Sequence, residues 1–310
     1  MQSNAISCVC LMGPTAVGKT DWALEWSDLL PVEIISIDSA MIYRDMDIGT
    51  AKPTSAILAR VPHHLIDICD PTDTYSAAQC CADVFSCCQD IYQRGKIPLL
   101  VGGSMMYFRA LQQGLSQLPA ADSVLRASLL EQALQHGWPM MHRRLSEVDP
   151  ISAQRIHPSD TQRIQRALEI YQTTGIPWSA LCESKPNQHN LRWFNVVMLP
   201  ESRAVLHARI AVRFKQMLGQ GFLDEVVQLT HKWSLTLAHP SMRCVGYRQA
   251  FEYLNGAYNH EIFVEKGLAA TRQLAKRQLT WLRNWPAAQM VFAHENKTIL
   301  EDIKQFIDNR

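Results

Sequence analysis

The sequence predicts an α/β protein with a P-loop-containing parallel sheet as its core and an inserted all-helical module. Three observations indicate this fold. A strand, a glycine loop and a helix pattern follow one another at the start of the chain, and short apolar strands then alternate with helix patterns up to residue 101. The middle of the chain has capped helices and no strand pattern. Alternation of strands and helices favours a parallel, doubly wound sheet.

The strands of the predicted core are short apolar runs rich in β-branched residues. The first leads directly into the glycine loop, and the second ends at Asp38. The expected strands are residues 5–12, 33–37, 65–68 and 98–101, with a helix over 76–94 before the last of them.

The middle of the chain predicts a helical insert. Ser159 and Gln162 fit a capping box at the start of one helix, and Gly175 marks its end. Strand character returns at residues 193–199, after which helix patterns dominate to about residue 285. We therefore expect a catalytic core made of residues 1–117 and 188–310, with a basic helical C-terminal part, and an inserted module of residues 118–187.

Composition excludes several classes of protein. Hydrophobic residues make up 47% of the chain and charged residues 19%, which is typical of a globular protein and not of a disordered one. No run approaches the ~18 apolar residues of a membrane span, and the apolar run 5–12 lacks the basic start of a signal peptide. We expect a cytoplasmic protein whose nine cysteines are reduced and mostly buried.

The charge is distributed unevenly although the net charge is only +1. Residues 1–100 hold 6 lysines and arginines against 12 acidic residues, whereas residues 203–283 hold 12 against 5. A basic block of this size is compatible with a polyanionic partner such as a nucleic acid, and equally with a solvated helix face.

The glycine loop GPTAVGKT at residues 13–20 matches the P-loop pattern GxxxxGK[ST] in full. Its backbone N–H groups and the following helix N-terminus form a cradle for phosphate, Lys19 adds a cation, and the Thr20 hydroxyl is a candidate ligand for Mg²⁺. The motif indicates a bound diphosphate-like group without specifying ATP. The candidate diphosphate- or nucleotide-binding residues are Gly13, Pro14, Thr15, Ala16, Val17, Gly18, Lys19 and Thr20.

Two further polar positions follow predicted strands and belong at the same sheet edge. Asp38 has three open roles: a carboxylate beside a metal, a general base, or a structural cap. Ser104 follows Gly102 and Gly103, where paired glycines allow a ligand or another backbone to approach closely. It is either a hydrogen-bond partner in the site or the N-cap of the next helix.

Trp281 and Trp285 lie close together on a predicted late helix. Aromatic residues on such a helix serve either in core and edge packing or as stacking platforms for bases. Packing is the favoured interpretation for both.

Seven blocks of the sequence, in order over about nine-tenths of the chain, resemble the tRNA dimethylallyltransferases. Several blocks are long and distinctive, so the resemblance is more specific than a P-loop alone. They are GPTAVGKT at 13–20, ISIDSAMIYRDMDIGTAKP at 35–53, PHHLIDICDP at 62–71, LLVGGSMMYFRAL at 99–111, IHPSDTQRIQRALEIY at 156–171, RCVGYRQ at 243–249 and TRQLAKRQLTWLR at 271–283.

The resemblance implies that the protein transfers a dimethylallyl group from dimethylallyl diphosphate to the N6 amine of the adenosine next to a tRNA anticodon. Asp38 then accepts the N6 proton and Ser104 orients the base or the diphosphate. Lys19, Mg²⁺ on Thr20, and Arg213 neutralise the leaving diphosphate. Arg209 lies one helical turn from Arg213 and leaves that last assignment open.

The resemblance also implies partners and tRNA-contacting segments. The partners are the tRNA anticodon stem-loop and dimethylallyl diphosphate, with no membrane and no obligate protein partner for a monomer. Many family members have Gln at the position of Met41 and Thr at that of Ser104. The implied tRNA-contacting residues are Asp38, Ser39, Ala40, Met41, Ser104, Arg126, Gln162, Arg163, Ile164, Gln165, Arg166, Arg243, Cys244, Val245, Gly246, Tyr247 and Arg248.

Two other functions remain compatible with the motifs alone. A small-molecule kinase with a P-loop would use ATP, and an RNA-binding nucleotide switch would bind without transferring a group. Transfer of label from the prenyl donor to RNA separates both from a prenyltransferase.

Overall fold

The computed structural model describes residues 5–116, 118–182 and 190–308. The chain divides into two compact units, Met1–Gln112 with Gln188–Arg310, and Gln113–Asn187. Each unit contains hydrophobic clusters of its own. The prediction of a parallel α/β core with a helical insert is confirmed.

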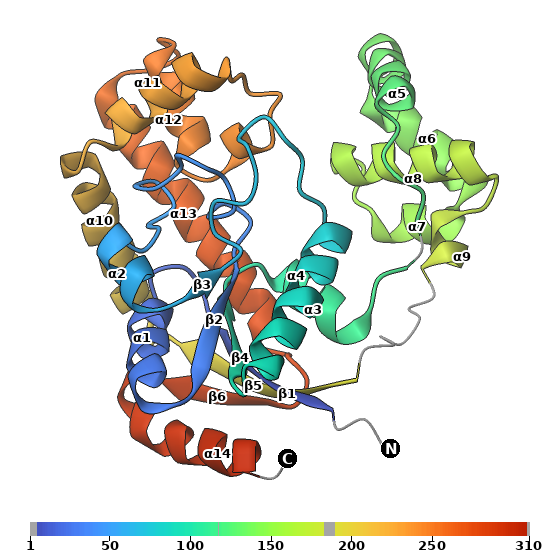
Figure 1. The fold of residues 1–310 in the computed structure, drawn as a ribbon. Helices are drawn as coiled ribbons and strands as arrows, with labels where there is room; N and C mark the ends of the chain where they lie inside the picture. Colours follow the sequence, from blue (N-terminus) through green and yellow to red (C-terminus); the bar gives the residue numbers. More distant parts are fainter. Residues whose placement is uncertain (1–4, 117, 183–189, 309–310) are drawn as a thin grey trace. The chain divides into compact units, whose positions relative to one another are not determined.

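The first unit is built on a six-stranded sheet whose strand order is β3-β2-β4-β1-β5-β6 (Figure 1). Every pair of neighbouring strands is parallel. The carboxyl ends of the strands therefore meet at one edge, which is where such sheets place their ligands. The strands are β1 Ile6–Met12, β2 Val32–Ile37, β3 His63–His64, β4 Ile97–Gly102, β5 Leu191–Leu199 and β6 Ala288–Phe292.

Helices cover both faces of the sheet, so its strands are apolar on both sides. Cys10 and Met12 of β1 belong to a cluster with α3 (Ala77–Gln93) and α4 (Met105–Gln113). Val9 and Leu11, which alternate with them, belong to a second cluster with α1 (Lys19–Leu29) and α14 (Asn296–Asp308). The two-residue period of the strand thus divides its side chains between two hydrophobic layers.

Helices late in the chain form a third cluster with the loop that follows β2. Phe214, Phe222 and Tyr247 pack in it against Ile42 and Met46 of the loop. This cluster fixes the loop beside the carboxyl edge of the sheet. The remaining helices of the first unit are α2 Ser55–Arg60, α10 Arg203–Gly219, α11 Phe222–Trp233, α12 Tyr247–Leu254 and α13 His260–Leu282, with short 3₁₀ turns at Ser241–Arg243 and Ala293–Glu295.

The second unit is a small helical bundle with a core of its own. Its helix α8 begins after Asp160, whose side chain accepts a hydrogen bond from the backbone N–H of Arg163. The predicted capping box of Ser159 and Gln162 is therefore wrong, because Asp160 caps the helix, whereas the predicted stop at Gly175 is confirmed. The helices are α5 Ser123–His136, α6 Trp138–Val148, α7 Pro150–Arg155, α8 Thr161–Thr174 and α9 Trp178–Leu181.

The predicted strand at residues 65–68 is wrong. Pairing with β2 ends at His64, and both Leu65 and Asp67 have positive φ angles, 63° and 55°. Left-handed backbone at alternate positions bends the chain away from the sheet. The apolar side chains there instead pack on the loop and on α3, as Leu65 does.

The cysteines are free and most of them are buried, as expected. Among the described residues, no helix combines the length and the apolarity that crossing a membrane requires.

Candidate active site

The phosphate-binding loop lies between β1 and α1, at the carboxyl edge of the sheet. Gly18, with a φ of 110°, takes a left-handed conformation at the start of α1. The ammonium group of Lys19 donates hydrogen bonds to the backbone carbonyls of Gly13 (2.9 Å) and Pro14 (2.8 Å). The lysine thus lies folded over its own loop, where an anion bound in the cradle would meet it.

Two cations share this pocket with one carboxylate. Burial lowers the pKa of Lys19 to about 8, with Asp38 opposing the shift and Arg213 adding to it. Burial also lowers the pKa of Arg213 on α10, again against the attraction of Asp38. Clustered, partly desolvated cations of this kind are strongly attracted to an anionic ligand such as a diphosphate.

A single side chain from a distant helix connects the P-loop with the end of β4. Gln278 of α13 accepts a hydrogen bond from the backbone N–H of Thr15 (2.9 Å) and donates one to the carbonyl of Gly103 (2.9 Å). A Cβ atom on Gly103 would lie 2.4 Å from the Gln278 nitrogen, so any other residue here would displace the Gln278 amide. On the other side of the loop, Arg209 donates to the carbonyl of Val17 (2.8 Å).

Asp38 follows the last residue of β2 and closes a short turn with its own carboxylate. One oxygen accepts hydrogen bonds from the backbone N–H groups of Ala40 (2.8 Å) and Met41 (3.3 Å). The hydroxyl of Ser104 accepts from the N–H of Ser39 (3.1 Å) and donates to its hydroxyl (3.3 Å). The ends of β2 and β4 are thereby held together, and the predicted proximity of Asp38 and Ser104 is observed.

Two neighbouring cavities meet at this edge of the sheet. The larger, of about 590 Å³, contains Ser39, Ala40, Ser104, Arg243, Cys244, Val245, Gly246 and Tyr247 in its lining. The smaller, of about 160 Å³, is lined on its P-loop side by Lys19 and Thr20, and also by Met41. Both are lined by Thr15, Asp38, Arg213 and Gln278. Asp38 and Arg213 therefore lie at the junction between a phosphate cradle and a larger chamber.

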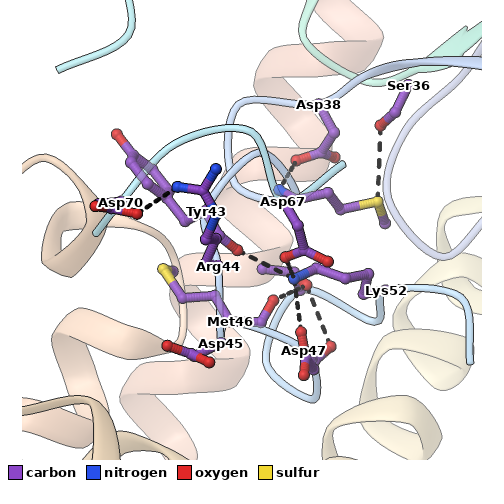
Figure 2. Close-up of polar contacts among 12 residues, drawn as sticks. Ser36, Asp38, Tyr43, Arg44, Asp45, Met46, Asp47, Lys52, Asp67 and Asp70 are labelled. Carbon is purple, nitrogen blue, oxygen red and sulfur yellow. Dashed lines mark hydrogen bonds and ion pairs between the residues drawn. The ribbon is translucent and has the colours of Figure 1, made fainter. Parts of the chain in front are cut away.

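The loop after β2 is held in shape by a buried lysine (Figure 2). Only 3% of the Lys52 side chain is exposed, and its ammonium donates to the Tyr43 carbonyl (3.0 Å) and to the carboxylates of Asp47 (2.6 Å) and Asp67 (2.5 Å). Farther toward β2, the Ser36 hydroxyl donates to the sulfur of Met41 (3.9 Å). These contacts hold the loop in place where it lines the larger cavity.

Glu225 of α11 binds the backbone of the same loop after β2. Its carboxylate accepts the backbone N–H groups of Asp47, Ile48 and Gly49 at 2.6–3.1 Å and the hydroxyl of Tyr247 at 2.5 Å. Burial, together with this carboxylate, raises the pKa of Tyr247 well above its usual value. Because the hydroxyl is engaged with Glu225, the side of the tyrosine that lines the chamber is its ring.

The basic residues of the late block differ in how they are held. Arg243 is exposed and donates to the carbonyls of Leu237 (3.4 Å) and Ala238 (2.9 Å). Arg248 is 57% exposed and pairs with Glu252 (3.0 Å). Burial, with Asp38 adding to it, raises the pKa of the Cys244 thiol to about 12, so the thiol is neutral near Asp38.

In the second unit, two of the arginines implied as tRNA contacts hold a buried carboxylate. Glu169 is fully buried and receives Arg126 (3.0 Å) and Arg166 (2.7 Å). Ile164 is fully buried in the core of this unit, and Gln165 donates to the carbonyl of Arg126. Gln162 and Arg163 are exposed, Arg163 by 64%.

The sequence alone did not single out Gln278 or Glu225. Gln278 lies inside one of the resembling blocks but has no charge or motif position that marks it. Glu225 is one of two acidic residues in the first turn of α11, where attraction to the helix dipole already explains an acidic residue. Arg209, which the sequence offered only as an alternative to Arg213, donates a hydrogen bond to the Val17 carbonyl of the P-loop. Arg213, in contrast, lines both cavities.

The fold and the site together define a P-loop transferase, in which a phosphate cradle opens onto a larger chamber. The family model described as IPP transferase matches residues 41–285. The chain belongs to the IPP transferase family. Its activity is tRNA dimethylallyl transfer.

Curated relatives and solved structures resemble the chain over nearly its whole length. A tRNA dimethylallyltransferase of Legionella pneumophila (strain Corby) is 54% identical over 303 residues, 97% of each chain. One of Chromobacterium violaceum is 56% identical over 287 residues, 92% of this chain and 88% of the relative.

The crystal structure of a tRNA isopentenylpyrophosphate transferase of Bacillus halodurans has a TM-score of 0.72 at 32% identity, covering 99% of this chain and 98% of that one. A eukaryotic dimethylallyltransferase acting on tRNA has a TM-score of 0.80 at 25% identity, covering 99% and 80%.

Proposed function

We propose that the protein transfers the dimethylallyl group of dimethylallyl diphosphate to the N6 amine of the adenosine next to the anticodon in tRNA. The observation that supports this most is the position of Asp38, which lines both the phosphate side and the larger chamber. A base there can reach an amine in the chamber while the donor occupies the cradle.

The donor's diphosphate binds the loop 13–20. Backbone N–H groups of the loop and the N-terminus of α1 supply partial positive charge, and Lys19 and Arg213 supply full charges. The lysine gives up its hydrogen bonds to the Gly13 and Pro14 carbonyls for phosphate oxygens, which accept from a cation more strongly than neutral carbonyls do.

The oxygen donors near the cradle fit Mg²⁺. Thr20 and Asp38 both line the smaller cavity, and Mg²⁺ prefers oxygen ligands with several from substrate phosphates and water. Within the described residues, no group of three His, Cys, Asp or Glu side chains could hold a metal by itself. The ion, when bound, neutralises charge on the diphosphate.

The acceptor adenosine enters the larger chamber after leaving the loop stack, because its amine cannot otherwise reach the donor. The N6 nitrogen attacks C1 of the prenyl group, the C1–O bond to diphosphate breaks, and Asp38 accepts the N6 proton. An allylic carbon tolerates positive charge, so stabilisation of the departing diphosphate by Lys19 and Arg213 supplies much of the rate. Ser104, held to Ser39, orients the base.

Each unit has exposed arginines that can contact phosphates of the anticodon stem-loop. Arg243 and Arg248 are exposed in the first unit. Arg163 is exposed in the second unit. Arginines contact phosphates without reading sequence, so they position the RNA while the chamber selects the base. Arg126 and Arg166 serve chiefly by holding Glu169 and with it the helices that present Arg163.

One incubation tests the proposal. The purified protein is given tRNA, Mg²⁺ and either dimethylallyl diphosphate labelled in the prenyl group or ATP labelled in the γ-phosphate. We expect label from the prenyl donor in the RNA, at the N6 position of the adenosine next to the anticodon. Label from ATP in a small molecule would indicate a kinase, and binding of RNA without transfer of either label would indicate a nucleotide switch.

A further inference from the structure

Helix α13 presents one continuous face to the larger chamber. Leu274, Gln278 and Trp281 all line the chamber, and their spacing of four and three residues places them on the same side of a helix. Gln278, the middle one of the three, binds the P-loop. Trp281 lies one turn farther along, toward solvent.

Trp281 is a cavity-lining residue that is also open to solvent. Its side chain is 39% exposed, and Met106 of α4, which lines the same chamber, is 57% exposed. Trp285, predicted on the same helix, instead follows the end of α13 at Leu282; it is only 8% exposed and packs edge-on against Phe108. The expectation of packing is therefore confirmed for Trp285, whereas Trp281 contributes part of its ring to the chamber's mouth.

The charges around Trp281 favour a polyanion. The guanidinium of Arg109 lies over the indole at 5.6 Å from the ring centroid, which supports the ring from one side. Arg277 also lines the chamber, and its side chain is exposed. An exposed aromatic ring beside arginines is a combination that binds single-stranded nucleic acid, because every nucleotide has a base that can stack on the ring and a phosphate that the arginines can neutralise.

The acceptor base must leave its stack to enter the chamber, and its neighbour in the RNA then loses a stacking partner at the chamber's mouth. We propose that Trp281 is a stacking platform for the unpaired nucleotide adjacent to the acceptor adenosine. This proposal rests on the proposed function, since it takes the acceptor to be a base in tRNA. The platform lowers the cost of extruding the adenosine and fixes its register over Asp38.

The test pairs protein variants with altered RNA. Anticodon stem-loops are made intact, with an abasic site 5′ of the acceptor adenosine, or with an abasic site 3′ of it. Dissociation constants are measured for the wild type, Trp281→Ala and Trp281→Phe. Ile262→Ala, an exposed apolar residue of α13 that does not line the chamber, is the matched control.

We expect Trp281→Ala to bind the intact stem-loop about 5- to 150-fold more weakly, and Trp281→Phe to retain most of the affinity. One of the two abasic stem-loops should bind the wild type as weakly as intact RNA binds Trp281→Ala, with no further loss when the two changes are combined. Binding of dimethylallyl diphosphate and the affinity of Ile262→Ala should be unchanged. If the alanine variant does not fold, Trp281→Leu keeps apolar bulk without a π-face and takes its place.

Additive losses with both abasic stem-loops, or wild-type affinity of Trp281→Ala for intact RNA, would overturn the platform. The proposed function fails separately, by absence of prenyl transfer to intact stem-loop in the wild type. Transfer by the wild type together with additive losses removes the platform and leaves the proposed function in place.

Discussion

Gln278 and Thr15 lie 263 residues apart in the chain and are joined by a hydrogen bond of 2.9 Å, from the Thr15 backbone to the Gln278 amide oxygen. The amide nitrogen simultaneously donates to Gly103. One buried amide from α13 thus fixes the separation between the phosphate cradle and the end of β4.

We expect Gln278→Met, which keeps the volume but removes both hydrogen bonds, to lower the free energy of unfolding by about 1–3 kcal/mol because it leaves buried polar groups without partners. It should also weaken donor binding by about tenfold through a looser cradle. Urea denaturation and donor titration measure the two effects. Gln273→Met, an exposed glutamine of the same helix, should change neither. Equal effects at both positions would contradict the bridging role.

Lys19→Ala should lose most of the turnover, about 10²–10³-fold, because the leaving diphosphate loses a cation. The affinity for tRNA should change little, since Lys19 faces the donor. Collapse of tRNA binding with donor affinity intact would refute the assignment.

The pKa of Lys19, lowered by burial to about 8, predicts a pH dependence. The lysine is charged below that pH and loses its charge above it, so kcat/KM for the donor should fall as pH rises through about 8. Lys19→Arg stays charged throughout and should lack this fall. A profile that is the same for both proteins would assign the titration to another group.

Asp38→Asn preserves the oxygen that accepts the N–H groups of Ala40 and Met41, and so keeps the turn. It removes the base, and we expect kcat to fall on the order of 10²–10⁴. Single-turnover rates with both substrates saturating measure the effect, with Asp90→Asn on exposed α3 surface as control. Wild-type rates in Asp38→Asn would eliminate Asp38 as the catalytic base.

Arg163 and Arg166 should behave differently although they share one helix. Arg163 is 64% exposed, so Arg163→Ala should leave stability unchanged and reduce the salt slope of tRNA binding by roughly 0.7–0.9 if it meets one phosphate. Arg166→Ala removes one of the two arginines that pair with the buried Glu169 and should lower stability by about 1–3 kcal/mol. Calorimetry and binding at several salt concentrations test both. An unchanged slope for Arg163→Ala would remove Arg163 from tRNA recognition.

The lowered pKa of Glu33 predicts that the folded protein loses stability in acid. Burial raises the pKa of Glu33, but hydrogen bonds from Arg94, His64 and Lys96 outweigh burial and lower the pKa to about 2, from an ordinary 4.5. A carboxylate with a lowered pKa stabilises the fold at pH values above its ordinary pKa of 4.5. This contribution is lost as the pH falls toward the pKa of about 2 that the group has in the folded protein. The difference in unfolding free energy between the wild type and Glu33→Gln should shrink over that interval. A constant difference from neutral pH downward would contradict the ion-pair origin.

Elements with strong periodicity or a motif were predictable from sequence, and elements defined by distant contacts were not. The P-loop at residues 13–20, the strand ending at Asp38 and the α3 region have local patterns that tertiary structure preserves. The segment 65–68 is apolar like a strand, yet left-handed residues turn it onto α3. The edge strand β6, which is largely exposed, lacks the continuous apolar run that marks a buried strand.

The residues of the candidate site also fall into those that local sequence predicts and those that depend on distant contacts. Residues whose chemistry is intrinsic, such as Lys19 and Asp38, could be named from type and position. Glu225 and Gln278 act through backbone groups of segments far away in the chain, and local sequence carries no record of those partners. Arg166 has the charge of a phosphate contact, but its role in holding Glu169 depends on a neighbour that only the fold provides.

The position of β1 in the sheet has a consequence for how the chain is made. β1 pairs with β4 on one side and with β5 on the other. Ile6 therefore cannot form its pairing in the sheet until Leu191 has been synthesised. During synthesis on a ribosome, the whole inserted unit emerges before that second pairing partner does. The contact order of the central sheet is therefore high, which slows its folding, and one backbone edge of β1 stays open to other chains meanwhile. We expect the compact helical insert, which has a hydrophobic core of its own, to fold ahead of the sheet that it interrupts.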